Sequence, residues 1–227
     1  MEILLIAGLW LEASAWDAVV PPLQEHGHHV TPVSLPGQGA PPENATLEDQ
    51  RSAVLAALDA AGAPAMVVGH SAAGTLAWMA CDARPDAVAR VVMVGGFASG
   101  DGAEYASFFE IADGAMPFPG WQEFEGPDSA DLDPARRQAI AAAAVPVPAG
   151  VATGIVHLTD ERRYDVPVTL VCPEYSTDDA RDWIQNGQMP EIARARSVDY
   201  VDIDSGHWPM FTRPQELADL LASLADD

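Results

Sequence analysis

The stretch that decides the fold is Ala65-Met-Val-Val-Gly-His-Ser-Ala-Ala-Gly74. An apolar run ends at a serine with small residues, Gly69 and Ala73, two positions away on either side, and a helical pattern follows immediately. A serine on such a tight strand-to-helix turn has strained backbone angles, and its neighbours pass too close for larger side chains. The turn lifts the Ser71 hydroxyl clear of the sheet and directs the first amides of the helix toward it. Small residues also surround serines at purely structural junctions, so the order of the other elements matters.

Short β-branched apolar runs alternate with helical patterns along most of the chain. This alternation predicts an α/β fold with a mostly parallel, doubly wound sheet. The predicted strands are Ile3–Ala7, Val30–Val33, Ala65–Gly69, Arg90–Val94, Val166–Cys172 and Val198–Ile203. The predicted helices are Ala15–His26, with a kink or restart at its two prolines, Leu47–Ala60, Ser71–Ala83, Pro134–Ala144 and Pro214–Ala225. Thr46 and Asp49 have the spacing of a capping box at the start of the second helix.

The segment 98–163 interrupts this alternation with aromatic residues set among prolines and glycines. It is too long for a simple connection between strands and too short for a second domain. We therefore expect an inserted cap over 98–163 and a core formed by 1–97 and 164–227.

Charge and cysteine content narrow the possible functions. The 227 residues include 34 acidic and 11 basic side chains, which gives a net charge of −23, and 48% of the residues are hydrophobic. Such a negative charge repels phosphates, so neither a nucleic acid nor an anionic membrane is an expected partner. The two cysteines, Cys81 and Cys172, are far apart, and Glu2 stands where a signal peptide would be positive. We expect a cytoplasmic protein with free thiols and no membrane-spanning segment.

Two further motifs accompany the serine turn. Leu35-Pro-Gly-Gln-Gly39 follows the second predicted strand, and Gly206-His-Trp-Pro209 follows the last. With these landmarks in this order, nearly the whole chain resembles the α/β-hydrolase fold family, and most closely its compact esterase-like members. Where that family usually has His-Gly after the first strand, this chain has Ala7-Gly8. The missing histidine supports the loop in the family, so its absence does not exclude hydrolysis.

The resemblance implies a role for each matching residue. Ser71 is the expected nucleophile and His207 the expected general base, with the backbone amides of Leu9 and Ala72 as the oxyanion hole. A serine nucleophile favours acyl transfer to water and disfavours the relatives that use an aspartate at this position. Neither a metal site nor a cofactor is expected, because the sequence has no dinucleotide fingerprint, P-loop or metal-ligand cluster.

The third member of the catalytic triad is ambiguous. Counting from the strand that ends at Cys172 places Ser176 where the family commonly has its aspartate. Glu174 lies two residues earlier with a longer side chain and ranks first as the acid. Asp101, which follows the preceding strand, ranks second. Asp178 ranks third because it falls in the first turn of the next helix, where acidic residues often serve the helix dipole.

Large aromatic residues suggest the character of the substrate. Trp10, Phe108, Trp121 and Trp208 either follow the catalytic loops or lie in the insert, and they are expected to line an apolar pocket at the carboxyl edge of the sheet. The predicted function is a serine hydrolase for small or medium apolar esters. A catalytically weak or inactive ligand-binding protein is the alternative, and a lyase or acyltransferase would use the same residues.

Overall fold

The computed structural model describes residues 1–39 and 44–226. Its centre is a six-stranded sheet in which every neighbouring pair is parallel, in the order β2-β1-β3-β4-β7-β8. The strands are β1 Glu2–Ile6, β2 His29–Pro32, β3 Ala65–His70, β4 Val88–Val94, β7 Val168–Cys172 and β8 Val198–Asp202. All six predicted strands are present within one or two residues of the expected bounds, and the predicted α/β class is confirmed.

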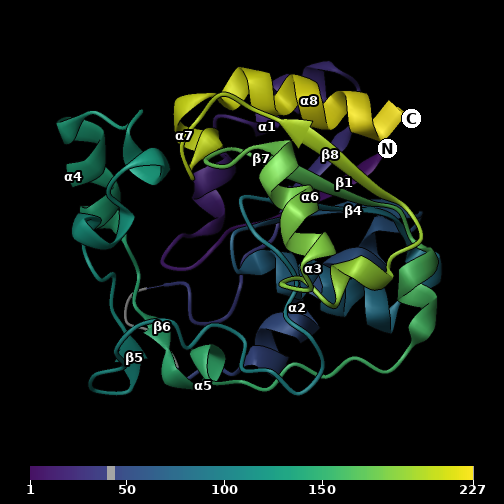
Figure 1. Ribbon diagram of the computed structural model, residues 1–227, viewed down its shortest axis with the longest axis horizontal. Coiled ribbons are helices and arrows are strands. Elements are labelled where there is room, and N and C mark those ends of the chain that lie inside the picture. The colour runs from purple at the N-terminus through teal and green to yellow at the C-terminus, as the bar shows by residue number, and fades with distance from the viewer. Residues whose placement is uncertain (40–43, 227) are drawn as a thin grey trace.

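Helices cover both faces of this sheet. In Figure 1, α1 (Val20–Glu25) and α8 (Pro214–Asp226) lie above the sheet, and α2 (Leu47–Ala61) and α3 (Ala73–Ala83) lie below it. Alternate residues of a strand point to opposite faces of the sheet. Leu5 packs in the cluster that contains Leu217 of α8, whereas Leu4 packs in the cluster that contains Leu76 of α3. The sheet is therefore buried on both sides, which explains why its strands are continuously apolar.

Local signals account for the helix ends. Thr46 and Asp49 form the predicted capping box at the start of α2, and Gly62 ends that helix in the left-handed conformation. The predicted break at Pro21 also occurs: a short 3-10 helix, η1 (Ala13–Trp16), precedes α1, and α1 carries proline in its first turn.

The chain between β4 and β7 forms a long insert outside the parallel sheet. Its elements are β5 Ala115–Met116, η3 Trp121–Phe124, η4 Pro127–Ser129, α4 Pro134–Ala143, β6 Val147–Pro148, α5 Ala149–Ala152 and η5 Glu161–Asp165. β5 and β6 pair antiparallel. Figure 1 shows α4 and the β5–β6 pair standing to the left of the parallel sheet. The remaining elements are α6 Thr177–Gln185, η6 Ile192–Arg194 and α7 Pro209–Thr212.

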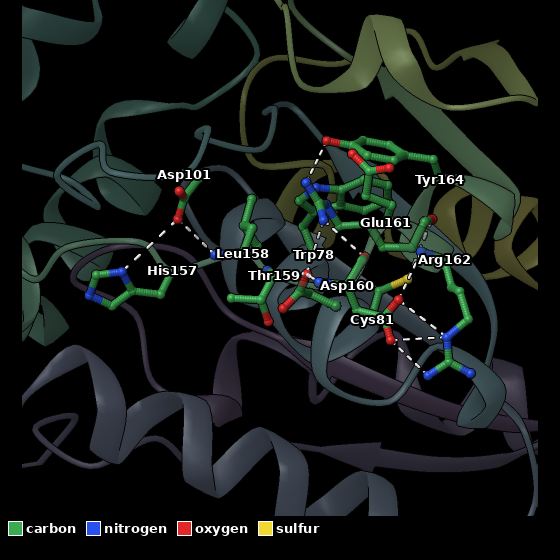
Figure 2. Close-up of polar contacts among 12 residues, drawn as sticks. Trp78, Cys81, Asp101, His157, Leu158, Thr159, Asp160, Glu161, Arg162 and Tyr164 are labelled. Carbon is green, nitrogen blue, oxygen red and sulfur yellow. Dashed lines mark hydrogen bonds and ion pairs between the residues drawn. The ribbon is translucent and has the colours of Figure 1, made fainter.

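A buried ionic cluster attaches the end of the insert to the core. Arg163, only 3% exposed, forms ion pairs with Asp82 of α3 at 3.1 Å and with Glu191 at 2.9 Å. The indole nitrogen of Trp78 and the hydroxyl of Tyr164 also donate to Glu191, each at 2.9 Å. Figure 2 labels these two aromatic residues. Because an unpaired buried charge is costly, the cluster holds the insert in one position before the chain enters β7.

No helix among residues 1–39 and 44–226 has both the length and the apolarity needed to cross a bilayer.

Candidate active site

Ser71 occupies a strained turn between β3 and α3. Its φ of +56° lies in the left-handed region, which is uncommon for any residue except glycine. Its backbone amide donates to the Val94 carbonyl of β4 at 2.8 Å, which fixes the turn against the neighbouring strand. A Cβ atom at Gly69 would overlap the Ala73 carbonyl, and one at Gly96 would overlap the Ser71 carbonyl. The glycines therefore permit the close backbone approach that the turn requires.

His207 lies on the loop after β8, and the insert holds that loop in place. The His207 backbone amide donates to the carbonyl of Asp128 at 2.7 Å, and the amide of Gly206 donates to the side chain of Asp131 at 2.9 Å. Both aspartates lie more than seventy residues earlier in the chain. Sequence reasoning missed them because no local spacing connects them to the histidine.

His70, beside the serine, supports the same loop from the core. Its Nε2 atom donates to the His207 carbonyl oxygen at 2.8 Å. Burial and the proximity of His207 lower the pKa of His70 to about 3, so this imidazole is neutral at physiological pH. His70 is thus a positioning residue for the His207 loop.

Glu174 is the carboxylate that meets His207. Its Oε1 atom lies 2.7 Å from His207 Nδ1, and both side chains are 13% exposed. Glu174 follows the end of β7 by two residues. A Cβ atom at Gly95 would come within 3.3 Å of both Glu174 Oε2 and His207 Nδ1, so the missing side chain leaves room for the pair. With Nδ1 donating to Glu174, Nε2 is the nitrogen left to accept a proton.

The other two candidate acids lie elsewhere. Asp101 accepts a hydrogen bond from the Leu158 amide at 2.9 Å and lies 4.0 Å from His157, as Figure 2 shows. Asp178 is on the surface, with its side chain 91% exposed and paired with Arg181 at 3.0 Å. The structure therefore brings the first-ranked candidate to His207 and neither of the alternatives.

Ser176, at the position where the family pattern places an aspartate, has a structural use. Its hydroxyl accepts from the amide of Asp179, and the Asp179 carboxylate accepts from the Ser176 amide, which makes a capping box for α6. The three-residue spacing between Ser176 and Asp179 is typical of a capping box and could have revealed this role from the sequence.

The two amides expected to bind an oxyanion flank Ser71. Leu9 follows β1 and Ala72 precedes α3, at the carboxyl ends of adjacent parallel strands. Within the described part of the chain, no main-chain oxygen accepts a hydrogen bond from either amide. Trp10 anchors the loop that contains Leu9, because its indole nitrogen donates to the Met116 carbonyl at 3.1 Å. The backbone of Trp10 has a φ of +62°, in the left-handed region. Both amides are thus without a main-chain acceptor among the described residues, and Leu9 lines the same cavity as Ser71.

An aromatic cavity of about 200 Å³ opens at Ser71 and His207. Its other lining residues are Leu9, Trp10, His70, Phe108, Phe109, Phe124 and Trp208. Three of the four aromatic residues expected there are present. The fourth, Trp121, packs behind the wall, with its ring 5.2 Å from that of Trp208 and its indole donating to the Arg137 carbonyl.

Comparison with known proteins identifies the family. A model described as "Alpha/beta hydrolase family" matches residues 3–220. The chain belongs to the alpha/beta hydrolase family. The chain is 26% identical to Methylesterase 7 of Arabidopsis thaliana over 257 residues, which covers 99% of this chain and 96% of that protein.

Solved structures of this family share the fold. An extracellular alpha/beta-hydrolase from a Paenibacillus species, described as structurally and functionally homologous to tobacco Salicylic Acid Binding Protein 2, superposes with a TM-score of 0.78. It is 21% identical, and the match covers 98% of each chain. A pyrethroid hydrolase from Sphingobium faniae has a TM-score of 0.74 at 20% identity, covering 100% of this chain and 97% of its own. At these identities the likeness establishes the fold.

Proposed function

We propose that this member of the alpha/beta hydrolase family is a cofactor-independent serine hydrolase that cleaves small or medium esters with an apolar acyl group. The observation that carries the proposal is the 2.7 Å contact between Glu174 and His207, on a loop that shares a cavity with Ser71. A carboxylate at Nδ1 holds the imidazole in the tautomer that accepts a proton at Nε2 and stabilises the charge that then forms.

The proposed reaction has two steps. Ser71 Oγ attacks the ester carbonyl while His207 takes its proton, and the amides of Leu9 and Ala72 stabilise the oxyanion. His207 then returns the proton to the departing alcohol, which leaves an acyl group on Ser71. Water, deprotonated by the same histidine, releases the carboxylic acid. The aromatic cavity supports an apolar acyl group, because it presents few polar atoms to a substrate.

A serine-directed fluorophosphonate tests this proposal. We expect the wild-type protein to be labelled at Ser71, with loss of fluoride and formation of a Ser–P bond, and the Ser71→Ala variant to remain unlabelled. Hydrolysis of p-nitrophenyl acetate should disappear in the same variant and in His207→Ala. A folded wild-type protein that neither reacts with the probe nor turns over the ester contradicts the proposal and favours a ligand-binding protein on this fold.

A further inference from the structure

A second and larger hollow also opens at Ser71. Its volume is about 700 Å³, and it shares Ser71 and Phe108 with the 200 Å³ cavity. The loop after β4 forms one wall, and the turn after β7 together with α6 forms another. The residues that matter for its chemistry are Phe97, Asp128, Glu174, Tyr175 and Trp183. We call this space the outer hollow.

Three aromatic rings form one wall of the outer hollow. The centroid of Phe97 lies 5.5 Å from that of Tyr175 and 5.7 Å from that of Trp183, and the last two rings are 4.9 Å apart. Phe108, 63% exposed, stands at its edge. Aromatic faces carry partial negative charge and attract cations, most strongly when the cation is weakly hydrated, as a substituted ammonium group is.

The outer hollow is also negatively charged. Asp128 and Glu174 line it, and among the described residues that do so there is no arginine or histidine side chain. Burial and the nearby Glu174 carboxylate raise the pKa of Asp128, whereas His207 lowers it. The Oε2 atom of Glu174 is buried and has no hydrogen-bond partner among the described residues. A cation held here would offset the repulsion between the two carboxylates.

The two spaces at Ser71 therefore differ in chemistry. The 200 Å³ cavity has aromatic walls and no carboxylate, so it suits a small apolar acyl group. The outer hollow is larger and combines aromatic rings with carboxylates, so it suits a bulky positive group that must depart after the acyl group is transferred. The net charge of −23 attracts such substrates at long range at low ionic strength.

We propose that the outer hollow binds a substituted ammonium group, and that the preferred substrates are esters of amino alcohols whose cationic nitrogen lies against Phe97, Tyr175 and Trp183 and near Asp128. This inference rests on the proposed serine hydrolase activity and specifies its substrate class. The reaction is unchanged: Ser71 gains the acyl group, and the amino alcohol leaves with the proton that His207 returns.

A matched pair of substrates tests this inference. Acetylthiocholine and 3,3-dimethylbutyl thioacetate have nearly the same shape, but only the first is charged. The kcat/KM ratio of the two is measured by release of the thiol at 0.15 M salt, where long-range attraction is screened. We expect the cationic ester to be preferred by about tenfold, the size of a partly desolvated cation–π contact.

Two variants test whether the preference for the cationic ester arises in the outer hollow. Both Asp128→Asn, which retains the main-chain carbonyl that holds His207, and Trp183→Leu should reduce the ratio at least threefold. Glu123→Gln is the matched control: it removes one carboxylate from an exposed position in the same insert and should leave the ratio unchanged. Circular dichroism of each variant checks that it is folded.

Several results overturn the inference. These are equal or lower kcat/KM for the cationic ester, a preference that survives both site variants, and failure to cleave either thioester by a protein that cleaves p-nitrophenyl acetate. In each case labelling of Ser71 and hydrolysis of p-nitrophenyl acetate would remain, so the proposed hydrolase activity would stand. Loss of those two activities contradicts the hydrolase itself.

Discussion

Replacing Glu174 by glutamine separates the charge of this residue from its shape. Glutamine retains an oxygen that can accept from His207 Nδ1, so the tautomer and orientation of the ring are preserved and only the negative charge is lost. Both side chains are 13% exposed, which corresponds to an intermediate dielectric environment rather than to open water. Opposite unit charges about 4 Å apart interact by about 4 kcal/mol at an effective dielectric constant of about 20.

That interaction exists only when His207 is protonated, as it is in the transition state. Since each 1.36 kcal/mol corresponds to a factor of ten, Glu174→Gln should lower kcat by about 10³. KM should change little, because Glu174 does not act on the ground state of an uncharged ester. The corresponding aspartate-to-asparagine change in a serine protease costs about 10⁴, a larger loss because the imidazole there takes the wrong tautomer.

The assay is hydrolysis of p-nitrophenyl acetate, with the active fraction measured by fluorophosphonate titration. Asp101→Asn and Asp178→Asn are the controls and should retain kcat within about twofold, since Asp101 contacts Leu158 and Asp178 pairs with Arg181 on the surface. A Glu174→Gln variant that keeps more than a tenth of the wild-type kcat contradicts this role of the Glu174 charge. So does a control variant that loses as much activity as the glutamine variant.

Two further predictions concern stability. His70 has its pKa lowered to about 3 in the folded state against 6.5 when unfolded, so the unfolded state binds more protons and stability falls as the pH drops below 6.5. His70 should contribute about 2 kcal/mol of this loss of stability between pH 6.5 and 5. The free energy of urea unfolding should therefore depend less on pH in His70→Gln than in the wild type. An equal pH dependence in the two proteins would contradict the lowered pKa of His70. Gly69→Ala should cost about 1–3 kcal/mol and slow fluorophosphonate labelling at least tenfold, because its Cβ overlaps the Ala73 carbonyl. Gly74→Ala, in the helix α3 that follows, meets only ordinary contacts and should be neutral or stabilising. Equal unfolding midpoints for the two variants would contradict the steric effect at Gly69.

The sequence predicted the features that depend on neighbouring residues. Strands, helices and the capping box at Thr46 arise from short-range patterns of apolar and polar side chains, so they can be identified without the tertiary fold. The serine turn is of the same kind, since Gly69 and Ala73 are small for a reason that lies within five residues of chain. Local counting was misleading at Ser176, where one serine was compatible with both a missing acid and a helix cap.

Features that join distant segments were decided by the tertiary structure alone. The ranking of three carboxylates could be argued from reach, but only the convergence of β7 and β8 at one edge of the sheet places Glu174 against His207. The amide contacts of the His207 loop with Asp128 and Asp131 depend on how the insert folds back over the core. The position of Trp121 behind the cavity wall, rather than in it, also depends on how the insert folds. Glu174 and His207 are 33 positions apart and Asp131 and Gly206 are 75 positions apart, and no periodicity encodes such separations. The physical reason is that hydrophobic patterning specifies which face of an element is buried, whereas packing of complete elements specifies which side chains meet.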